Sequence, residues 1–485
     1  MKNILIVTRE VVPFYHGGIG TLFMAIANLL RAEGHCVALL INRPVDFEAS
    51  IFQEYYNDIE LFFIEGKGLG SEKRYSPSGG NVSAYNLAYS IAVEEAFGKI
   101  YTSFKPDIVI AADFGAELLA VLLQRAGGKY PAARFMLHLS GGLHEALAVY
   151  EGGTGEEFSS ELEEPQNRLT CSMENLCLKL VDEIITPTEI AWEEVTRRLD
   201  IKNKVVHTIP NLQGDKLQTA NSLASSDTAE KNILFIGRLD RHKGADRILR
   251  VFMRYLEKYG GGTRLILLGR DCYWKEYGRS FLEEWNEKIP YAWKSFIEFK
   301  GQVSHVYVKE YLATSMVCLF PSRWEVFGNV ALEAMAAGVP AFVSKGTGLE
   351  EVVGKDLASF ALDFEETETS ANALHDFLSD RDAQAYVKRI VRKRAFRVIN
   401  NGETGYKKLV TTEPRNNSVN EQSLLFTELP HLLKAVTEIT GALATDADRV
   451  AQYCGFSEEK IKHIVQGKER KSSSLLGRLP FVKNK

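Results

Sequence analysis

Cysteine is scarce in this sequence: the chain has six cysteines in 485 residues, and no two of them form a C-x-x-C pair. No histidine completes the spacing of a zinc-ligand set with them, so a structural zinc site is not expected. Reduced thiols in a cytosolic protein are the expected state. The cysteines stand at positions 36, 171, 177, 272, 318 and 454.

An excess of positive charge is also missing. The 58 Lys and Arg residues are outnumbered by 63 Asp and Glu residues, which gives a net charge of -5. A protein that binds duplex nucleic acid normally carries a basic excess that neutralises the phosphates. We therefore expect no nucleic-acid partner.

Long hydrophobic runs are absent as well. Near the N-terminus, the apolar run 4–7 is followed by Arg9 and Glu10, so it is too short for the hydrophobic region of a signal peptide. Residues 11–30 contain no charged side chain, but Pro13 and three glycines interrupt their first half. Because a membrane span needs about 20 continuous apolar residues, no transmembrane segment is expected.

The chain instead has the length and patterning of a globular protein with at least two domains, since one domain has about 150 residues. Short β-branched runs alternate with longer helical patterns, which is typical of βαβ units and parallel sheets. The candidate strands are 3–8, 36–41, 107–111, 134–138, 183–186, 205–209, 232–237, 264–268, 297–299, 317–320 and 341–343.

These strands fall into two series, separated by residues 213–231, which contain no aromatic residue and are rich in Ser, Ala, Asp and Lys. This composition predicts a linker. We expect two tandem Rossmann-like, doubly wound α/β domains at 1–212 and 232–411, facing across a cleft at the carboxyl ends of their strands.

Residues 412–485 predict a helical C-terminal extension, with helices near 423–442 and 446–466. The last twenty residues hold six basic residues against one Glu, with apolar residues among them. Peripheral contact of this basic tail with the inner membrane face and a frayed or locally docked tail are both consistent with the pattern.

The first motif is the glycine-rich turn 17–21 (GGIGT), between the first strand and the helical stretch 22–31. Glycines here let backbone N–H groups approach an anion at the positive end of a helix. Phe23 stands at the third glycine of the dinucleotide fingerprint, and no acidic residue ends strand 36–41, so a nicotinamide cofactor is disfavoured. A phosphate-facing loop and a plain tight turn both stay open.

The second motif is the turn 237–244 (GRLDRHKG), which directly follows a strand. Arg238 offers a planar fork of donors and Lys243 a compact ammonium, and both suit a diphosphate. Gly244 permits close packing of the loop on the following helix. An ordinary exposed basic turn is the alternative.

The third motif is the stretch 321–340 (PSRWEVFGNVALEAMAAGVP). Gly328-Asn329 predicts a loop and helix N-cap, and residues 330–337 predict a helix. Glu325 then lies in the loop and Glu333 in the second helical turn, and both carboxylates can accept hydrogen bonds from sugar or ribose hydroxyls. As an isolated pair, two glutamates at this spacing are common.

With these three motifs in this order and at these distances, the sequence resembles a retaining nucleotide-sugar glycosyltransferase of the GT-B fold, family four. The resemblance covers about residues 1–355 and is most specific over 232–354. It implies that the domain at 1–212 binds an acceptor and the domain at 232–411 binds the donor.

The resemblance also implies a role for each matching residue. Arg238 and Lys243 would bind and neutralise the diphosphate leaving group, and Glu325 would hold the donor sugar's hydroxyls. Glu333 would hold the ribose hydroxyls. Backbone groups would complete the donor site at Gly18, Phe327, Gly328, Asn329 and Val330.

The family further places a histidine after a strand of the N-terminal domain, near the reacting sugar. His138, which ends the strand 134–138, fits this position, and His144 is a nearby competitor. A structural histidine at a strand end is the alternative. Asp113, after strand 107–111, is a candidate on the acceptor side, and a helix N-cap explains it equally well.

The sequence departs from the family pattern at three places. Leu212-Gln213 follows Ile209-Pro210-Asn211 where Gly-Val-Asp is usual, Val326 replaces a proline, and Glu350 occupies a second proline's place. None of these changes removes a proposed chemical group. They leave the identity of the donor sugar open.

The expected activity is therefore retaining, metal-independent transfer of a hexose to a hydroxyl of a glycan or lipid-linked acceptor, in polysaccharide or glycoconjugate biosynthesis. The family's habits favour a UDP-sugar donor, with a GDP-sugar second and no further cofactor. The alternatives are a GT-B-like phosphorylase, a nucleotide-sugar epimerase and a catalytically inactive nucleotide-sugar-binding protein.

Overall fold

The computed structural model describes residues 1–14, 17–44, 46–56, 58–64, 85–150, 164–213, 232–274, 277–413 and 432. The chain divides into two compact units. Unit 1 comprises Met1–Thr186, Val195–Thr208 and the described residues from Tyr406 on, and unit 2 comprises Pro187–Glu194 and Ile209–Gly405.

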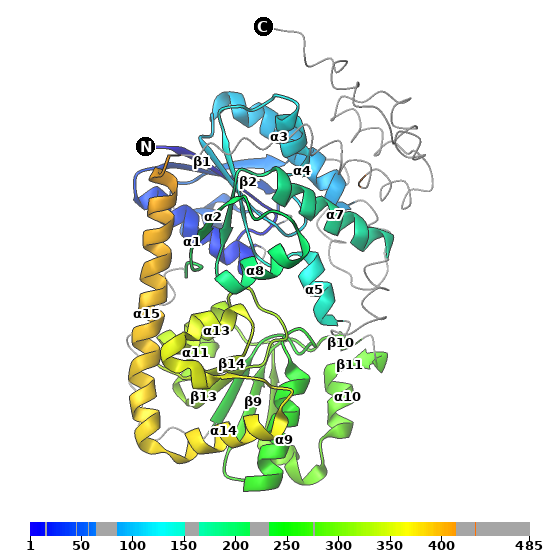
Figure 1. The fold of residues 1–485 in the computed structure, drawn as a ribbon, viewed down its shortest axis with the longest axis vertical. Helices are drawn as coiled ribbons and strands as arrows, with labels where there is room; N and C mark the ends of the chain where they lie inside the picture. The colour runs from blue at the N-terminus through cyan, green and yellow to red at the C-terminus, as the bar shows by residue number, and fades with distance from the viewer. Residues whose placement is uncertain are drawn as a thin grey trace. The chain divides into compact units, whose positions relative to one another are not determined.

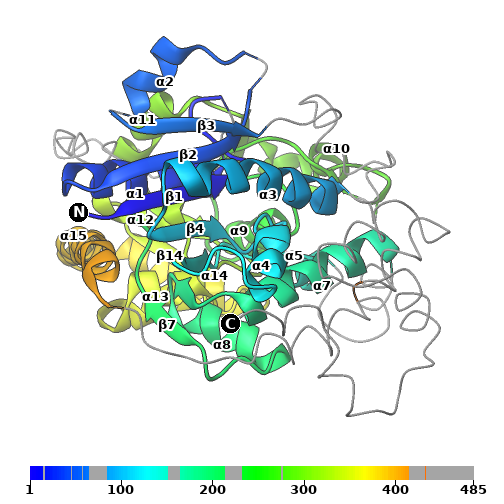
Figure 2. The ribbon, with the colours of Figure 1, turned by 90° about the horizontal axis from the view of Figure 1, so that it is seen from above.

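Unit 1 is built on a seven-stranded sheet in the order β3-β2-β1-β4-β5-β6-β7, in which every neighbouring pair is parallel. The strands β3, β2, β1 and β4 lie side by side in Figure 2. The chain leaves β1 toward β2 on one side and later adds β4 on the other, so the strand order reverses between β1 and β4. The strands are β1 (Asn3–Thr8), β2 (Cys36–Asn42), β3 (Glu60–Ile64), β4 (Ile108–Ala112), β5 (Arg134–His138), β6 (Glu183–Thr186) and β7 (Val205–Thr208).

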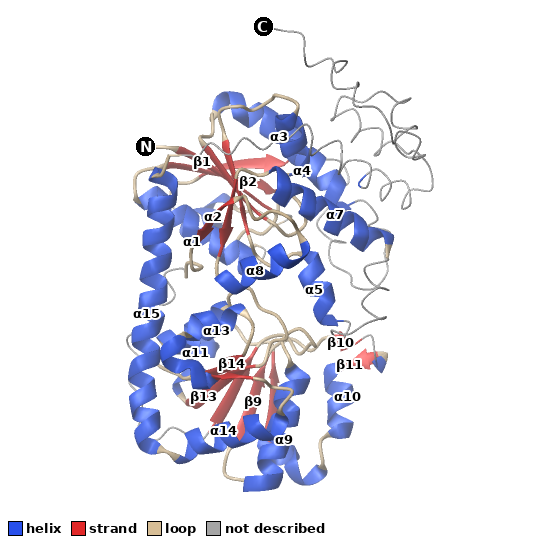
Figure 3. Ribbon diagram, viewed as in Figure 1, coloured by secondary structure: helices blue, strands red, loops and turns tan. Residues whose placement is uncertain are grey.

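Helices flank this sheet, as Figure 3 shows. They follow the strands in alternation, because each parallel connection needs a crossover segment. The helices are α1 (Gly18–Ala32), α2 (Ala49–Tyr55), α3 (Tyr85–Ser103), α4 (Leu119–Ala126), α5 (Leu143–Tyr150), α7 (Pro165–Leu180) and α8 (Glu189–Arg198), of which α8 has its first six residues in unit 2.

Unit 2 is built on a six-stranded parallel sheet in the order β12-β9-β8-β13-β14-β15. Its strand order reverses between β8 and β13. A short antiparallel hairpin, β10 with β11, lies apart from this sheet. The strands are β8 (Asn232–Ile236), β9 (Arg264–Leu268), β10 (Tyr273–Trp274), β11 (Arg279–Ser280), β12 (Ile297–Gly301), β13 (Ser315–Phe320), β14 (Ala341–Ser344) and β15 (Ala361–Leu362).

The helices of unit 2 end with α15, a single long helix that contributes residues to both units (Figure 1). The helices are α9 (Ala245–Tyr259), α10 (Phe281–Lys288), η4 (Tyr291–Phe296), α11 (His305–Ala313), α12 (Asn329–Ala336), α13 (Gly348–Val353), η5 (Lys355–Phe360), α14 (Thr367–Ser379) and α15 (Arg381–Thr411).

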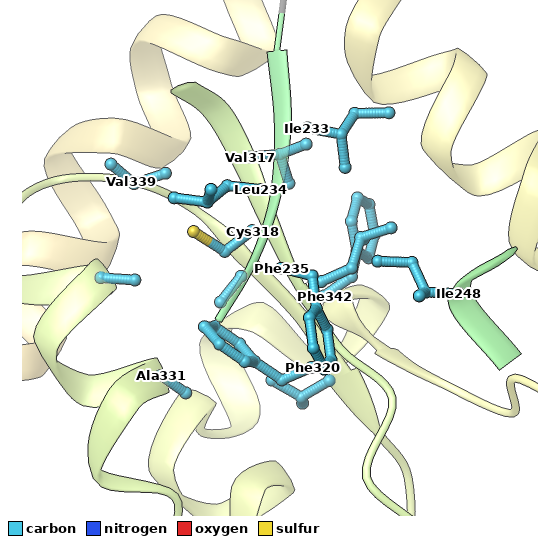
Figure 4. Packing of buried hydrophobic residues seen from close by; sticks show 14 of the residues in the cluster. Ile233, Leu234, Phe235, Ile248, Val317, Cys318, Phe320, Ala331, Val339 and Phe342 are labelled. Carbon is cyan, nitrogen blue, oxygen red and sulfur yellow. The ribbon is translucent and has the colours of Figure 1, made fainter. Parts of the chain in front are cut away.

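The core of unit 2 explains why its strands read as continuous apolar runs. Side chains of β8 pack among those of β13 and β14 and against flanking helices, and all of them are buried except Ile236 and Met316, which are partly buried. Because helices cover both faces of a parallel sheet, successive residues of one strand are buried alternately on opposite faces. Figure 4 shows this packing for Ile233, Leu234, Phe235, Ile248, Val317, Cys318, Phe320, Ala331, Val339 and Phe342.

The fold class expected from the sequence is confirmed, and each candidate strand lies within two residues of an observed strand at both ends. Three features were not expected from the sequence: β3, β15 and the hairpin β10–β11. The strand β3 lies at a sheet edge with its first residue exposed, so it lacks the buried apolar run by which the others are recognised.

The compact units differ from the contiguous division at 1–212 and 232–411 in three segments, 187–194, 209–212 and 406–411. Residues 187–194 belong to unit 2, where Thr188 donates to the backbone oxygen of Val326 over 2.8 Å and the carboxylate of Glu351 accepts the Ile190 N–H over 2.6 Å. The end of α15 belongs to unit 1, where Arg134 donates to the backbone oxygen of Leu409 over 3.2 Å.

Several expectations fall outside the described residues. They are residues 214–231 of the linker, the helices near 423–442 and 446–466 except residue 432, the basic tail, and the thiol of Cys454. In the part of the chain that the structure describes, Cys36, Cys171, Cys177, Cys272 and Cys318 carry free thiols.

Candidate active site

The second and third motifs meet at the point in unit 2 where the strand order reverses. The turn 237–244 follows β8, and residues 321–328 follow the neighbouring strand β13. In open α/β sheets, ligands bind outside the carboxyl ends of the strands at such a point. Topology therefore brings together two loops that are far apart in the sequence.

Lys243 and Glu325 form an ion pair that joins these two loops. The Lys243 side chain is 27% exposed and that of Glu325 18%, so both remain partly open to solvent. Burial alone would raise the pKa of Glu325, but the charge and the hydrogen bond of Lys243 outweigh it and hold the pKa below its ordinary value. Glu325 is thus a carboxylate at neutral pH.

Arg323 fixes the relative position of the same loops. Its guanidinium lies 2.7 and 2.8 Å from the two carboxylate oxygens of Asp246, at the start of α9, and donates to the backbone oxygen of Arg241 over 2.7 Å. Its backbone N–H donates to the backbone oxygen of His242 over 2.9 Å. A planar, two-pronged contact of this kind restricts orientation as well as distance.

Arg238 lies on the exposed side of the turn, with Nε 3.0 Å from Oδ2 of Asp240. Asp240 also accepts the backbone N–H of Lys243 over 2.7 Å, so one buried carboxylate orders both basic residues. Burial, with the adjacent charge of Lys243, lowers the pKa of His242 to about 4. The positive charge offered to an anion therefore comes from Arg238 and Lys243, with His242 neutral.

Gly244 makes the close approach between the loops possible. It adopts a left-handed conformation with φ 71, and a Cβ there would lie 2.0 Å from the backbone oxygen of Pro321. Glycine is the residue that tolerates both conditions. Gly244 therefore allows its turn to pack closely against the loop after β13, in addition to the packing on the following helix that the sequence predicts.

The structure corrects one expectation for the third motif, the start of its helix. The helix α12 begins at Asn329 and not at Val330, and the N-cap is Gly328, which has φ 91. A Cβ on Gly328 would lie 2.1 Å from Cδ2 of Leu349, so glycine is required by space as well as by conformation. The Asn329 side chain is instead held by Asn211 and Gln213, over 3.3 and 3.2 Å.

The remaining residues of the third motif flank this helix start. Phe327 is buried in the core, whereas Val330 and Glu333 are half-buried on α12. The first amides of a helix have no acceptor within the helix and favour an anion. Unit 2 therefore assembles the basic pair, the carboxylate Glu325 and a helix N-terminus around one pair of strand ends.

In unit 1, the glycine-rich turn holds a carboxylate that was not singled out from the sequence. Oε2 of Glu10 accepts the Gly20 N–H over 2.9 Å, and a Cβ on Gly17 would lie 2.2 Å from the same oxygen. Burial raises the pKa of Glu10, and the Gly20 N–H opposes that shift. The helix α1 begins at Gly18 and not at residue 22, so the expected anion loop is its first turn.

His138 and Asp113 lie at the ends of the adjacent strands β5 and β4, and Ser140 connects them. Nδ1 of His138 lies 3.1 Å from Oγ of Ser140, while the Ser140 N–H donates to Oδ1 of Asp113 over 2.8 Å. The Asp113 N–H donates to the backbone oxygen of His138 over 3.0 Å. The structure thus brings these two candidates together within unit 1.

Asp113 does not cap the following helix. The N-cap of α4 is Leu118, so the alternative account of Asp113 as a helix cap is wrong. Asp113 is buried, and this burial raises its pKa to about 7. His144 lies half-buried on α5.

Neither a metal cluster nor a membrane helix is present in the described ranges. No group of three or more His, Cys, Asp or Glu side chains there is arranged to hold a metal ion. No helix in those ranges combines the length and apolar character needed to cross a membrane.

Two regions of the chain match known family models. Residues 222–394 match the family model described as glycosyl transferases group 1, and residues 3–140 match the starch synthase catalytic domain. The Arg238, Lys243 and Glu325 site lies within residues 222–394, the part of the chain that is similar to glycosyl transferases group 1 (here the group 1 domain). The glycine-rich turn, Asp113 and His138 lie within residues 3–140, the part that is similar to the starch synthase catalytic domain.

Relatives by sequence agree with this assignment. An uncharacterized glycosyltransferase of Methanocaldococcus jannaschii is 27% identical over 56% of this chain and 62% of its own. Glycogen synthase of Mycobacterium tuberculosis is 24% identical over 81% of this chain and 90% of its own. The chain spans 42% to 62% of the length of the first three relatives that it matches.

Solved structures share the two-domain fold over most of the chain. Sucrose-phosphate synthase of Thermosynechococcus elongatus has a TM-score of 0.64 at 20% identity, covering 84% of this chain and 98% of its own. HepE of Anabaena, solved with UDP and glucose, has a TM-score of 0.56 at 16% identity, covering 85% and 100%. The group 1 domain and unit 1 together therefore form a GT-B fold.

Proposed function

We propose that the protein is a glycosyltransferase that moves a hexose from a nucleotide-diphosphate sugar to a hydroxyl of a glycan or lipid-linked acceptor, with retention of the anomeric configuration. The observation that carries the proposal is the Lys243–Glu325 pair, with Arg238 beside it, at the strand reversal of the group 1 domain. A UDP-hexose is the favoured donor and a GDP-hexose the second.

The chemistry of this reaction explains why these residue types are needed. Cleavage of the bond between the anomeric carbon and the diphosphate builds negative charge on the phosphate and positive character on the sugar. Arg238 and Lys243 would stabilise the negative charge, and electrostatic stabilisation of this kind usually contributes most to the rate. In this proposal these two cations do the work that a divalent ion would otherwise do on the leaving group.

Glu325 and Glu333 would accept hydrogen bonds from hydroxyl groups and would not transfer protons. Glu325, held as a carboxylate by Lys243, would accept hydrogen bonds from the donor sugar, and Glu333 would accept them from the ribose. Backbone groups of Phe327, Gly328, Asn329 and Val330 would complete the donor site. Release of Glu325 from Lys243 as the phosphate arrives would couple leaving-group binding to sugar binding.

Retention would follow from attack on the face that the leaving group occupies, with the departing phosphate helping to remove the acceptor's proton. His138 would contact the reacting sugar, and Asp113 would lie on the acceptor side. The Gly18 amide would contact a donor phosphate. HepE was solved with UDP and glucose, which supports a nucleotide-sugar donor in a chain of this fold.

The proposal is tested by incubating the purified protein with UDP-glucose, GDP-mannose and ADP-glucose, with glycan and lipid-linked acceptors. We expect release of the nucleoside diphosphate from one donor, a product of unchanged anomeric configuration by NMR, and no loss of rate after chelation. Binding without release would show a binding protein, interconversion of free nucleotide sugars would show an epimerase, and release of a sugar phosphate from a glycan would show a phosphorylase.

Glu10 offers a second prediction, because its carboxylate lies at the turn where the Gly18 amide would contact the donor. We expect Glu10→Gln to tighten UDP binding about tenfold, since removal of a competing charge is comparable to one charge-assisted hydrogen bond, about 1.5 to 3 kcal/mol. Wild-type affinity should rise as the pH falls through the raised pKa of Glu10, and the variant should lose this dependence.

The matched control is Glu33→Gln, at the other end of the same helix, where Glu33 pairs with Lys407 on the surface. Calorimetric titration with UDP between about pH 5 and 8 measures both variants. Weaker binding in Glu10→Gln would contradict the competing role and show that Glu10 orders the turn.

A further inference from the structure

Glu174 makes two backbone contacts that the proposed reaction does not yet explain. It lies on α7, and its side chain is buried. Oε1 accepts the Gly115 N–H over 2.7 Å, and Oε2 accepts the Leu143 N–H over 2.8 Å. Gly115 follows β4 and Leu143 follows β5, so one carboxylate ties together the loops after two adjacent strands.

These two loops carry Asp113 and His138. The strands pair in register, with Ala112 opposite His138, and the loops are further joined through Ser140. A movement of either loop would therefore change the position of the Asp113 carboxylate and the imidazole together. Glu174 acts on both loops from a third element, and it does so through backbone amides rather than through the two proposed site residues.

The space around this carboxylate is narrow and acidic. A Cβ on Gly142 would lie 3.0 Å from Oε2 of Glu174, 2.9 Å from Oε2 of Glu145 and 3.8 Å from Oδ2 of Asp113. Glu145, on α5, also accepts a hydrogen bond from Nε of Arg198, on α8, over 2.7 Å. Three carboxylates therefore gather around a single glycine, with one arginine beside them.

Burial dominates the ionisation of this cluster. Burial, with the nearby Asp113 and Glu145, raises the pKa of Glu174 to about 8, against the Gly115 and Leu143 amides that lower it. The titratable groups that face Glu174 are Asp113, Glu145, Cys171 and Cys177, with the charge of Arg198 beside them. Burial thus brings the pKa of Glu174 to about 8 and that of Asp113 to about 7, close to neutral pH.

We propose that Glu174 is a positioning residue for glycosyl transfer, whose side chain holds the β4 and β5 loops, and through them Asp113 and His138, in register. This proposal rests on the proposed function, because that function assigns Asp113 and His138 to the acceptor and the reacting sugar. It adds a residue from α7 that touches neither substrate.

The test is Glu174→Gln, which keeps the size of the side chain but replaces one acceptor oxygen with an N–H donor. One of the two loop amides then loses its acceptor. We expect kcat to fall about 10- to 100-fold with the donor KM unchanged, because a misplacement of about 1 Å costs that much in rate. Because the ionised carboxylate accepts both amides better than the protonated form, we expect wild-type kcat to rise as the pH increases through the raised pKa of Glu174, about 8, and this rise to be absent from Glu174→Gln.

The matched control is Glu94→Gln, another buried glutamate of unit 1. Glu94 accepts the Tyr130 hydroxyl over 2.7 Å and belongs to α3. We expect this variant to lose stability with kcat and pH profile intact. Equal losses of activity in both variants, in proportion to the unfolded fraction, would reduce Glu174 to a structural residue and overturn the proposal.

A readout independent of catalysis separates this proposal from the proposed function. Amide exchange at Gly115 and Leu143 and the imidazole titration of His138, followed by NMR, should change in Glu174→Gln and not in Glu94→Gln. If the wild type transfers no sugar but these signals change, the proposed function fails, and what stands is that Glu174 holds the two loops. Unchanged signals overturn the positioning role. Should Glu174→Gln fail to fold, Glu174→Asp, which can reach one amide only, replaces it in the same measurements.

Discussion

Replacement of Lys243 by alanine should lower kcat for glycosyl transfer about 10²- to 10³-fold, the usual cost of removing one group that stabilises developing negative charge. Lys243 is the positively charged member of the pair with Glu325. It is therefore the member that can bind the leaving phosphate and stabilise its negative charge. The loss should persist at saturating donor, because the charge being stabilised exists mainly in the transition state.

The matched control is Lys258→Ala. Lys258 is also a lysine of unit 2 that pairs with a glutamate, Glu368, but it does so on the exposed surface of α9. Such pairs contribute about 0 to 1 kcal/mol, so this variant should keep both kcat and KM. Near wild-type turnover of Lys243→Ala at saturating donor would exclude its role on the leaving group.

Replacement of Gly244 by alanine should produce a large loss of stability for a change of one methyl group. A non-glycine residue in the left-handed conformation costs about 1 to 2 kcal/mol. The added Cβ would also lie 2.0 Å from the backbone oxygen of Pro321, and relief of that overlap should cost about 1 to 3 kcal/mol more. The two loops would separate, so UDP binding should be lost as well.

Gly34→Ala isolates the first of these two costs. Gly34 follows the end of α1 with φ 84, and a Cβ there would meet nothing within 4 Å. Its N–H donates to the backbone oxygen of Arg31 and the His35 N–H to that of Leu30, which are the hydrogen bonds of a left-handed helix end. Urea unfolding should show a smaller fall in midpoint for Gly34→Ala than for Gly244→Ala, with UDP binding kept only in Gly34→Ala. Equal midpoints would show that the contact with Pro321 carries no strain.

Much of the fold could be predicted because the buried strands have a simple signature. The strands β1, β8 and β13 are mostly apolar and buried, since helices cover both sheet faces. The turn 237–244 begins directly after the strand β8. The glycine-rich turn 17–21 lies in the connection that follows the strand β1. Their place at the sheet's carboxyl edge therefore followed from topology.

The pairing at the site could not be predicted in the same way. Lys243 and Glu325 are 82 residues apart, and only the neighbouring position of β8 and β13 makes them partners. Glu10 was not predicted to belong to the turn, because the sequence does not show that Gly17 and Gly20 leave space for its carboxylate. Glu174 lies in a helix with an ordinary sequence pattern. Only the structure shows that its carboxylate accepts hydrogen bonds from two backbone amides.

The division into units shows the same limit. No change of composition marks residues 187–194, yet Thr188 and Ile190 bond to Val326 and Glu351 of unit 2. Two of the three departures from the family pattern, Val326 and Glu350, thus lie at or beside these contacts. Comparison with the family pattern identifies these positions as different. Only the structure shows that they lie at or beside contacts with residues 187–194.

The most direct test of the central claim is a calorimetric comparison of UDP, UMP and uridine binding to the wild type and to Lys243→Ala. We predict that the wild type binds UDP more tightly than UMP by about tenfold or more, as one charge-assisted contact to the second phosphate requires. In Lys243→Ala this preference should disappear while uridine binding is unchanged. An equal preference for UDP in both proteins would contradict the assignment of Lys243 to the diphosphate.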